Sequence, residues 1–479
     1  MPAIVPGSAT PPTPAARPHW LRAAGVLALL GALLWGLSGR VPPLQSPDEH
    51  SHLARAWMLS QGQWRLDTPP GGSSGGEIDL ALLRFHDIYL SGIARDASAR
   101  LTPAQRQELA GLHWSTQRTF FPLPGTGYYL PLVYAPQALG LALGQWTQQT
   151  VPRSYALARL CTLAVCLGLL AAAWRLFRPG ALTWALLLLP MSLFQLVSPT
   201  LDGLTTSLLL LALSAFLRLM AGPRPGTAVL PRGLPALLCV ALLVLVTSRA
   251  HWLPLLVLPF ALAWRQRGQG QGGAGGPSAR AWLLAGTALL GLALAWTLWA
   301  LGHTVDLRVA RSHTTAQAVA LLVQQPAELL RVTAGTLTDP VLPRFYLKSF
   351  IGILGWLDTP LPRWGYPALG LALLGCAGLS LRAPRDAVDG ATRALLLGLA
   401  LATALLVFLA MLITWTPLPA SRIEGVQGRY FLGSALLLAG ALGGLREDDP
   451  APRWRGVALA ATAALSLGLL LTTLQARYG

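Results

Sequence analysis

Long apolar runs follow one another along the chain from residue 21 to residue 474, separated by short stretches rich in arginine, glycine and proline. A helix of about 20 apolar residues crosses the hydrocarbon core of a bilayer. The pattern therefore predicts an all-α polytopic membrane protein with about 11 transmembrane helices. These spans are expected at about 21–39, 155–174, 181–198, 203–219, 234–247, 252–264, 282–301, 364–381, 394–415, 429–445 and 456–474.

Arginines between the spans predict the orientation. Residues 1–20 are rich in proline and alanine and carry Arg17 close to the first span, so they are expected to form a disordered cytoplasmic tail. The remainder, 21–479, is predicted to be one integral membrane domain. Short arginine-bearing loops then fall on the cytoplasmic side, and two large loops, at about 40–153 and 302–363, face outward.

Two apolar stretches in these large loops do not fit as spans. If 128–147 crossed the bilayer, the arginines of the following short loops would move outside, so an interfacial helix is predicted within 120–147 instead. The stretch 346–358 is too short to span, and a second interfacial helix is expected there, with Trp356 at headgroup level. The glycine-rich run Gly71–Gly76 is predicted to be a flexible linker.

Composition supports the membrane assignment and narrows the partners. Hydrophobic residues make up 53% of the chain and charged residues only 11%, with a mean hydropathy of +0.52. A soluble protein carries about a quarter charged residues. The net charge of +17 comes from arginines that flank spans rather than form one basic face. Membrane lipids and phosphate-bearing lipids are therefore expected partners, and nucleic acid is not.

One short polar stretch, Ser46 to Trp57, lies just outside the first span and concentrates ionisable residues. Pro47 favours a helix start, and two carboxylates, Asp48 and Glu49, would lie in the first turn. Asp48, His52 and Arg55 would share one helix face. The stretch could take a proton from a hydroxyl, hold a phosphate or bind a divalent metal through its carboxylates and His52. A capped surface helix with solvated charges is the alternative, but ionisable clusters at a bilayer surface are costly unless used.

Other polar side chains gather on the predicted outer side, which holds 14 of the 19 acidic residues. Each has an ordinary structural explanation beside a ligand-binding one. Asp202 could cap the helix that follows it, and Asp358 could end the helix before it. Arg429 could reach anionic headgroups. The two short spans at 234–247 and 252–264 are predicted to form a hairpin, and Arg249 and His251 lie at its tip. The convergence of these separate segments favours a catalytic centre on the outer surface.

These motifs together resemble a family of bacterial multi-spanning membrane proteins of unknown function that is related to the GT-C membrane glycosyltransferases. The first motif behind this resemblance is Pro47-Asp48-Glu49-x-x-His52-x-x-Arg55-Ala56, followed by Leu59-Ser60-x-Gly62. The further matches are Tyr134-x-Pro136-Gln137, Leu189-Pro190-Met191, Ser198 to Asp202, Gly355-Trp356-Leu357-Asp358-Thr359-x-Leu361-Pro362 and Gly425-Val426-Gln427-Gly428-Arg429-Tyr430-Phe431.

The resemblance implies a GT-C-like fold with interfacial helices in two outer loops, and it implies residue roles. Asp48 would be the general base, and Glu49 would orient it or help to bind acceptor or metal. Arg429 and Arg249 would stabilise the departing lipid phosphate. The residues expected to bind substrate are His52, Arg55, Asp202, Arg249, His251, Trp356, Asp358, Gln427, Arg429 and Tyr430.

The function expected on this basis is an inverting membrane glycosyltransferase. It would move a sugar from a polyprenyl-phosphate donor to an envelope glycan, lipid or protein acceptor at the outer face of the bacterial cytoplasmic membrane. The sequence identifies no certain cofactor, and a divalent metal held by Asp48, Glu49 and His52 is a candidate. A transporter or flippase of lipid-linked glycans is the second hypothesis, although the span centres carry almost no charge and show no repeat. A scaffold protein of envelope assembly is the third.

Overall fold

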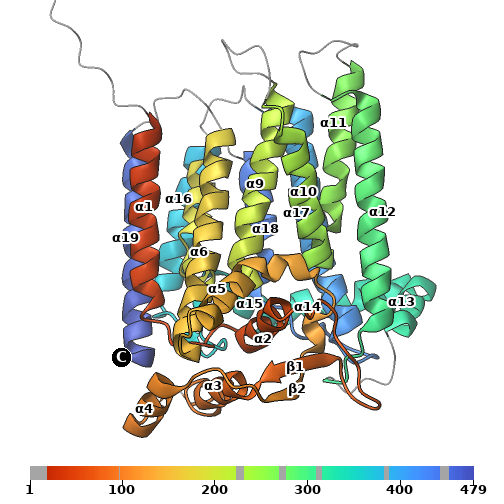
Figure 1. Ribbon diagram of the computed structural model, residues 1–479. Helices are drawn as coiled ribbons and strands as arrows, with labels where there is room; N and C mark the ends of the chain where they lie inside the picture. Colours follow the sequence, from red (N-terminus) through yellow and green to blue (C-terminus); the bar gives the residue numbers. More distant parts are fainter. Residues whose placement is uncertain are drawn as a thin grey trace, which may run out of the picture.

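The chain is described from a computed structural model that covers residues 19–96, 98–222, 231–268, 277–308, 315–381, 388–442 and 453–479. The predicted tail lies, up to residue 18, outside the described residues. Long helices stand side by side as an upright bundle, and shorter elements gather at one end of it, called the loop end below (Figure 1).

Five helices of the bundle are long and apolar enough to cross a membrane. They are α6 (Val151–Leu176), α9 (Leu201–Ala221), α12 (Ala279–His303), α17 (Gly390–Thr414) and α19 (Arg453–Tyr478). The other upright helices are α1 (His19–Ser38), α10 (Leu234–Ser248), α11 (Val257–Gly268), α16 (Gly365–Leu381) and α18 (Leu432–Leu442). The chain is therefore a helical membrane protein, and the total of 11 spans stays a prediction.

The predicted span at 181–198 is interrupted. It consists of α7 (Ala181–Leu187) and α8 (Pro190–Leu196), and the break lies where Pro190 removes a backbone donor and clashes with the preceding turn. The predicted hairpin of 234–247 and 252–264 is present as α10 and α11 with the 3₁₀ helix η3 (Ala250–Leu256) between them. Arg249 lies at its turn, at the loop end.

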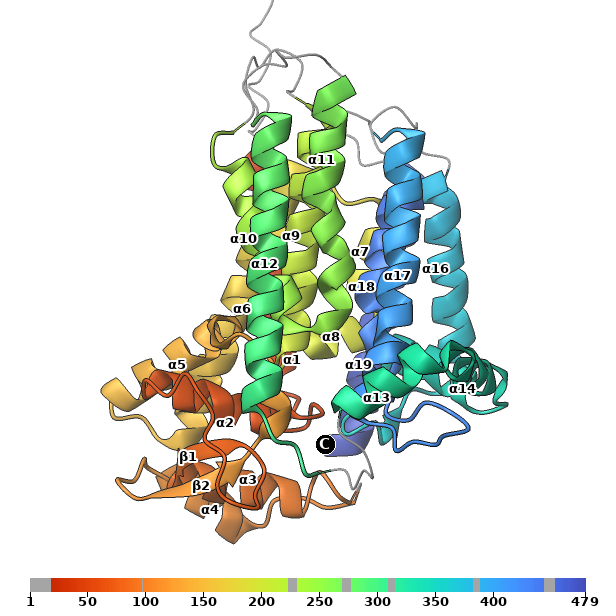
Figure 2. The same cartoon turned by 90° about the vertical axis from the view of Figure 1, so that its right-hand side faces the viewer.

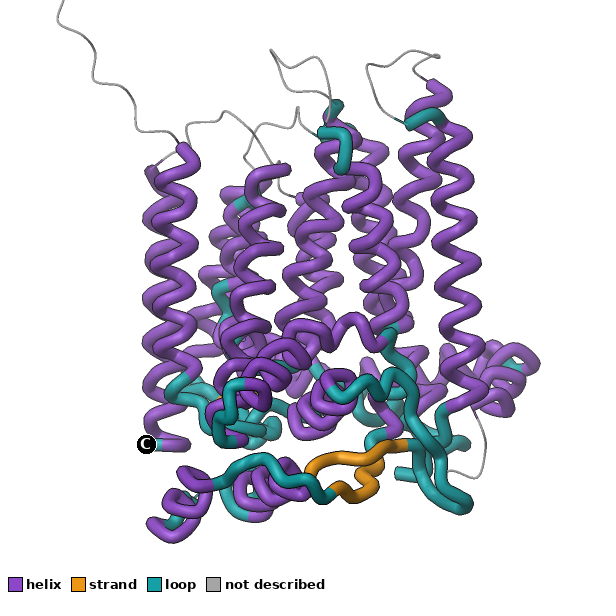
Figure 3. Tube along the Cα trace, viewed as in Figure 1, coloured by secondary structure: helices purple, strands orange, loops and turns teal. Residues whose placement is uncertain are grey.

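The loop end is built from the two large loops (Figures 1 and 2). The first contributes α2 (Glu49–Ser60), β1 (Gly75–Asp79), α3 (Leu80–Ser91), α4 (Pro103–Gly111), β2 (Arg118–Pro122), η1 (Pro124–Thr126), η2 (Pro131–Tyr134) and α5 (Ala135–Trp146). The second contributes α13 (Thr315–Gln324), α14 (Pro326–Thr338), α15 (Leu342–Gly352), β3 (Ile353–Leu354) and β4 (Thr359–Pro360). Strands β1 and β2 pair antiparallel, as do β3 and β4, and Figure 3 shows how small a share of the fold β1 and β2 occupy.

The glycine-rich run was predicted to be a flexible linker, and this prediction is wrong. Gly75 and Gly76 belong to β1, and the side chain of Ser74 is fully buried. A Cβ atom on Gly75 would lie 2.2 Å from the carbonyl oxygen of Phe121 on the partner strand. The glycines therefore permit two backbones to approach closely.

The predicted interfacial helices are partly confirmed. In the first loop only Ala135–Trp146 is α-helical, and α5 lies across the upright helices rather than along them (Figures 1 and 2). In the second loop α15 ends at Gly352, before Trp356, so the prediction of Trp356 on an interfacial helix is wrong. The positive φ angles of Gly355 (62°) and Leu357 (64°) turn the chain into the β3–β4 hairpin instead.

Apolar packing fixes α2 and α3 to the bundle. Leu53 and Trp57 of α2 and Phe85 of α3 belong to the same buried cluster as Leu163 and Cys166 of α6. The loop-end elements are therefore part of the core rather than appendages, and the polar residues that they carry are held rigidly. All four cysteines, which are Cys161, Cys166, Cys239 and Cys376, are free thiols.

Candidate active site

Asp48, Asp202, Arg249 and Arg429 form one continuous group of charged side chains at the loop end, called the charged cluster below. Arg429 lies between two carboxylates, with Nη1 3.1 Å from Asp202 Oδ2 and Nη2 3.6 Å from Asp48 Oδ2. The other oxygen of Asp202 pairs with Arg249. The side chain of Asp48 is 53% exposed, whereas that of Arg429 is only 3% exposed. The charged cluster thus offers one accessible carboxylate backed by the buried guanidinium group of Arg429 and the largely buried one of Arg249.

Four distant segments deliver these side chains, each from the loop-end terminus of a helix. Asp48 precedes α2, Arg249 follows α10, and Arg429 lies in η4 (Gly428–Phe431), which leads into α18. Asp202 lies in the first turn of α9, where the helix dipole favours a carboxylate. Its expected role as a cap is not seen, because the N-cap is Thr200 and Asp202 instead faces arginines.

The backbone at Asp48 differs from the expectation. Helix α2 begins at Glu49, not at Pro47, and Asp48 occupies the N-cap position with a left-handed conformation (φ 63°, ψ 4°). A left-handed non-glycine residue is uncommon and is typical of functional sites whose surroundings hold it in place. This geometry turns the side chain of Asp48 toward Arg429 rather than along the face of α2 that carries Arg55.

Glu49 supplies the restraint that holds this loop. Its carboxylate accepts hydrogen bonds from the backbone nitrogens of Leu44 (3.2 Å) and Ser46 (3.0 Å) and from the hydroxyl of Tyr155. Arg159 in turn donates to the Tyr155 oxygen at 2.5 Å. Burial raises the pKa of Glu49, although the charge of Arg159 opposes this effect. Glu49 is fully buried, so Asp48 is the accessible member of this pair of adjacent carboxylates.

We expect Tyr155→Phe to lower the free energy of unfolding by about 1–3 kcal/mol, because a buried carboxylate loses its hydroxyl donor. Thermal unfolding of the detergent-purified protein, followed by size-exclusion chromatography, measures the change. Tyr89→Phe is the matched control: Tyr89 is also buried at the loop end, but its hydroxyl makes no contact with Glu49. Equal stability of the two variants would contradict the role of Tyr155.

His52 lies beside the charged cluster as a neutral group. Its Nδ1 is 3.0 Å from the hydroxyl of Tyr134, and its ring stacks near that of Tyr129. Burial lowers the pKa of His52 to about 4, which outweighs the opposing effect of Asp48. At neutral pH the imidazole is therefore uncharged, and its Nδ1 is paired with the Tyr134 hydroxyl.

Three further residues were predicted to bind substrate, which are Tyr430, Gln427 and His251. The ring of Tyr430 lies within 5.6 Å of the Arg249 guanidinium and within 5.3 Å of that of Arg429. Gln427 Oε1 is buried and has no hydrogen-bond partner among the described residues. His251 packs its ring against Trp252, with centroids 4.3 Å apart, and is buried.

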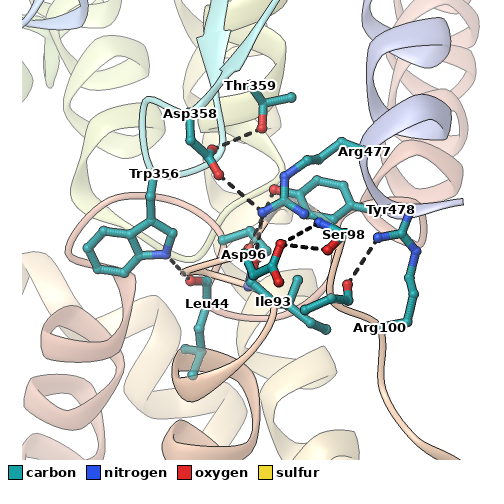
Figure 4. A network of polar contacts seen from close by, with 12 residues as sticks. Leu44, Ile93, Asp96, Ser98, Arg100, Trp356, Asp358, Thr359, Arg477 and Tyr478 are labelled. Carbon is teal, nitrogen blue, oxygen red and sulfur yellow. Dashed lines mark hydrogen bonds and ion pairs between the residues drawn. The ribbon is translucent and has the colours of Figure 1, made fainter.

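Trp356 and Asp358 belong to a second polar network at the loop end (Figure 4). Trp356 Nε1 donates to the carbonyl of Leu44, and its indole lies 5.6 Å from the ring of His50. Asp358 accepts from Arg477 at the end of α19, and Arg477 also donates to the carbonyl of Ile93. This network holds the β3–β4 hairpin against the loop that carries Asp48. Asp358 therefore has a partner within the chain, and its expected contact with a substrate stays a prediction.

The geometry also bears on Arg55 and on the candidate metal ligands. Arg55 donates to the carbonyls of Gln63 and Trp64 and so closes the turn after α2, away from the charged cluster. The candidate metal ligands Asp48, Glu49 and His52 do not converge, since Glu49 faces Tyr155 and the His52 Nδ1 faces Tyr134. Within the described ranges, no group of three or more histidine, cysteine, aspartate or glutamate side chains could hold a metal ion.

The sequence matches the family described as "Predicted membrane protein (DUF2142)" over residues 29–438. The chain belongs to this family. No curated protein matches it. Two crystal structures of ArnT from Cupriavidus metallidurans, one bound to undecaprenyl phosphate and one in the apo state, are similar to it with a TM-score of 0.32 each. Their sequence identities are 15% and 14%, and each comparison covers 94% of this chain and 78% of the other.

The region matched to the DUF2142 family contains the whole charged cluster, and it also contains residues that sequence reasoning missed. Tyr155 and Arg159 lie inside α6, where a single arginine within an apolar run was the available signal. Arg308 lies after α12 and acts electrostatically on His50. Nothing in its sequence surroundings distinguishes it from other loop arginines.

Proposed function

We propose that this DUF2142 protein is a membrane glycosyltransferase with a GT-C-like fold. It moves a sugar from a polyprenyl-phosphate donor to a hydroxyl of an envelope glycan, lipid or protein. The loop end then faces the outside of the bacterial cytoplasmic membrane. The observation that carries the proposal is the pairing of an exposed carboxylate, Asp48, with a buried guanidinium, Arg429, at the loop end of the bundle.

In the proposed reaction Asp48 is the general base. The acceptor oxygen attacks the anomeric carbon while its proton passes to the Asp48 carboxylate. The bond between that carbon and the phosphate oxygen breaks, and its electron pair stays on the departing polyprenyl phosphate. One displacement of this kind inverts the configuration at the anomeric carbon. A general base typically contributes about 10²–10⁴-fold to the rate.

The charges of the cluster suit the leaving group. Asp48 and Asp202 balance Arg249 and Arg429, so the cluster is nominally neutral before reaction. When Asp48 takes the proton, the cluster gains a net positive charge as the departing phosphate gains a negative one. Preorganised arginines that stabilise developing charge act without reorganising.

Both arginines also have unused donors. The Nε atoms of Arg249 and Arg429 are buried and have no hydrogen-bond partner among the described residues. Contacts with the face of Tyr430 hold both guanidinium groups in place. A polyprenyl phosphate is also the lipid bound in one ArnT structure, but the proposal rests on the side chains of this chain.

The proposal is tested by a transfer assay on the purified protein in lipid. Radiolabelled polyprenyl-phosphate sugars are supplied with a crude envelope fraction, and label in the acceptor is counted. We expect transfer with inversion at the anomeric carbon. Movement of the intact labelled lipid from one leaflet of the vesicle membrane to the other, without transfer of the sugar, would instead indicate a transporter.

We expect Arg429→Gln to weaken binding of polyprenyl phosphate about tenfold or more, because a hydrogen bond to a charged group contributes about 1.5–3 kcal/mol. Binding of labelled polyprenyl phosphate to the purified protein measures the change. Arg422→Gln is the matched control, since Arg422 lies in the same loop but is exposed and pairs with Asp339. Equal loss in both variants would argue against a phosphate site at Arg429.

A further inference from the structure

The segment after α12 is fixed across the first large loop. Val305 exchanges backbone and side-chain hydrogen bonds with Ser74: Ser74 N donates to Val305 O, and Val305 N donates to Ser74 Oγ, each at 2.8 Å. Leu307 N donates to Ser73 Oγ at 3.0 Å. The serines of the glycine-rich run thus serve as anchors. This attachment determines where the next side chain, Arg308, lies.

Arg308 is held in a defined orientation. Asp306 accepts from its Nε (3.0 Å) and its Nη2 (2.7 Å), and its guanidinium lies 5.7 Å from the ring centre of Trp415. A Cβ atom on Gly125 would lie 2.7 Å from Nη2, so the absence of a side chain there makes room for the guanidinium. The side chain of Arg308 is 39% exposed and that of Asp306 only 11%. The positive half of the pair therefore faces solvent.

Arg308 lies against η1 at Gly125, and η1 packs against α2, whose N-cap residue is Asp48. After Asp306, the carboxylate that acts most strongly on its charge is Asp48, and Arg308 acts in turn on His50, the second residue after Asp48. Arg429 contacts Asp48 from the buried side. Asp48 thus contacts one buried arginine, Arg429, and interacts at longer range with one exposed arginine, Arg308. Its Nη1 makes no hydrogen bond to any described residue.

His50, which lies within electrostatic range of Arg308, belongs to a group of three aromatic side chains. The ring of His50 lies 5.6 Å from Trp356 and 6.3 Å from Phe121 between ring centroids, and all three side chains are partly exposed. They come from α2, the β3–β4 turn and β2. Aromatic faces beside a guanidinium offer apolar contact together with a fork of donors that matches carboxylate or phosphate. An acidic sugar ring presents the complementary features.

We propose that Arg308 binds an acidic group of the acceptor, which is a saccharide carrying a carboxylate or phosphate near the reacting hydroxyl. This inference rests on the proposed function, because the acceptor must reach the exposed side of Asp48 to give up its proton. Arg249 and Arg429 hold the donor phosphate on the buried side, and Arg308 selects the acceptor on the open side.

The test measures binding, so it needs no turnover. The full-length protein is loaded with unlabelled polyprenyl phosphate, and three labelled disaccharides are compared by equilibrium dialysis. They differ only in the terminal residue, which is glucuronic acid, glucose 6-phosphate or glucose. We expect at least one acidic disaccharide to bind about tenfold more tightly than the neutral one, as one charge-assisted contact provides. The stronger of the two acidic ligands identifies the acidic group.

Arg308→Gln is expected to remove this preference and to leave binding of the neutral disaccharide within about twofold. Arg331→Gln is the matched control, because Arg331 also forms an exposed ion pair, with Glu328 on α14, and should change none of the three affinities. Asp306→Asn keeps the positive charge and should retain the preference. Equal binding of all three disaccharides by the wild type, or an equal loss of all three in Arg308→Gln, would overturn the inference.

The two proposals fail separately. A protein that prefers acidic disaccharides through Arg308 but transfers no label would refute glycosyl transfer and leave the acidic-saccharide site standing. A protein that transfers label equally well to neutral and acidic acceptors would confirm the enzyme and refute the site.

Discussion

Asp48→Asn is expected to lower the rate of sugar transfer by about a hundredfold or more, because asparagine keeps the shape of the side chain but cannot accept the acceptor proton. The fold should survive. Asp48 is half-exposed, and its ion pair with Arg429 is long, at 3.6 Å, so the pair contributes little to stability. Initial rates of label transfer at saturating donor measure the change.

Donor binding separates this effect from a loss of the site. Polyprenyl phosphate should bind Asp48→Asn at least as tightly as it binds the wild type, since Arg429 loses a competing carboxylate. Glu424→Gln is the matched control, because Glu424 is an exposed carboxylate of the loop that leads to Arg429. A transfer rate in Asp48→Asn within a few-fold of the wild type would show that Asp48 is not the base.

Much of the bundle could be predicted because a bilayer imposes a length and an apolar composition on each span. Residues 279–303 and 390–414 form long helices close to the predicted ranges. Hydropathy could not locate the break at Pro190, since α7 and α8 together form one continuous apolar stretch in sequence. Hydropathy also did not predict α13 and α14 in the second loop. These helices are short and only some of their apolar residues are buried, so their sequences do not resemble a span.

The loop end was harder to predict because glycine occurs both in flexible linkers and in strands whose backbones approach closely. The run Gly71–Gly76 has the composition of a linker, yet two of its glycines form a strand against Phe121. The turn at Gly355 follows a helical pattern that continues in sequence to Trp356. Only tertiary contacts, such as the bond from the Trp356 indole to Leu44, decide between a longer helix and a hairpin.

The charged cluster could be predicted as a set of residues but not as a geometry. Asp48, Asp202, Arg249 and Arg429 were all identified, since each is an ionisable residue at the end of an apolar run. Adjacent carboxylates cannot be told apart by spacing, however, and one left-handed residue decides that Asp48 is exposed while Glu49 is buried. The partner that buries Glu49, Tyr155, lies 106 positions away.

Asp202→Asn is expected to be the most destabilising change in the charged cluster. Its carboxylate is the counter-charge of two guanidinium groups, and its side chain is only 9% exposed. Removing one partner of a buried ion pair leaves an uncompensated charge and typically costs about 3–5 kcal/mol. Thermal unfolding in detergent measures the loss. In Asp202→Asn/Arg249→Gln the charges balance again, so the double variant should regain a large part of the stability that the single variant loses.

The single variant Asp202→Asn also tests the phosphate site, because an anionic ligand can replace the missing carboxylate. Polyprenyl phosphate should raise the unfolding temperature of Asp202→Asn by more than it raises that of the wild type. Uncharged polyprenol has the same chain without the phosphate. It should change the unfolding temperatures of Asp202→Asn and of the wild type by the same amount. A ligand that binds only the folded state stabilises it in proportion to the logarithm of its concentration over Kd. Equal stabilisation of both proteins by the phosphate would mean that the lipid phosphate binds away from Arg249 and Arg429. A larger effect on Asp202→Asn would mean that these two arginines hold it.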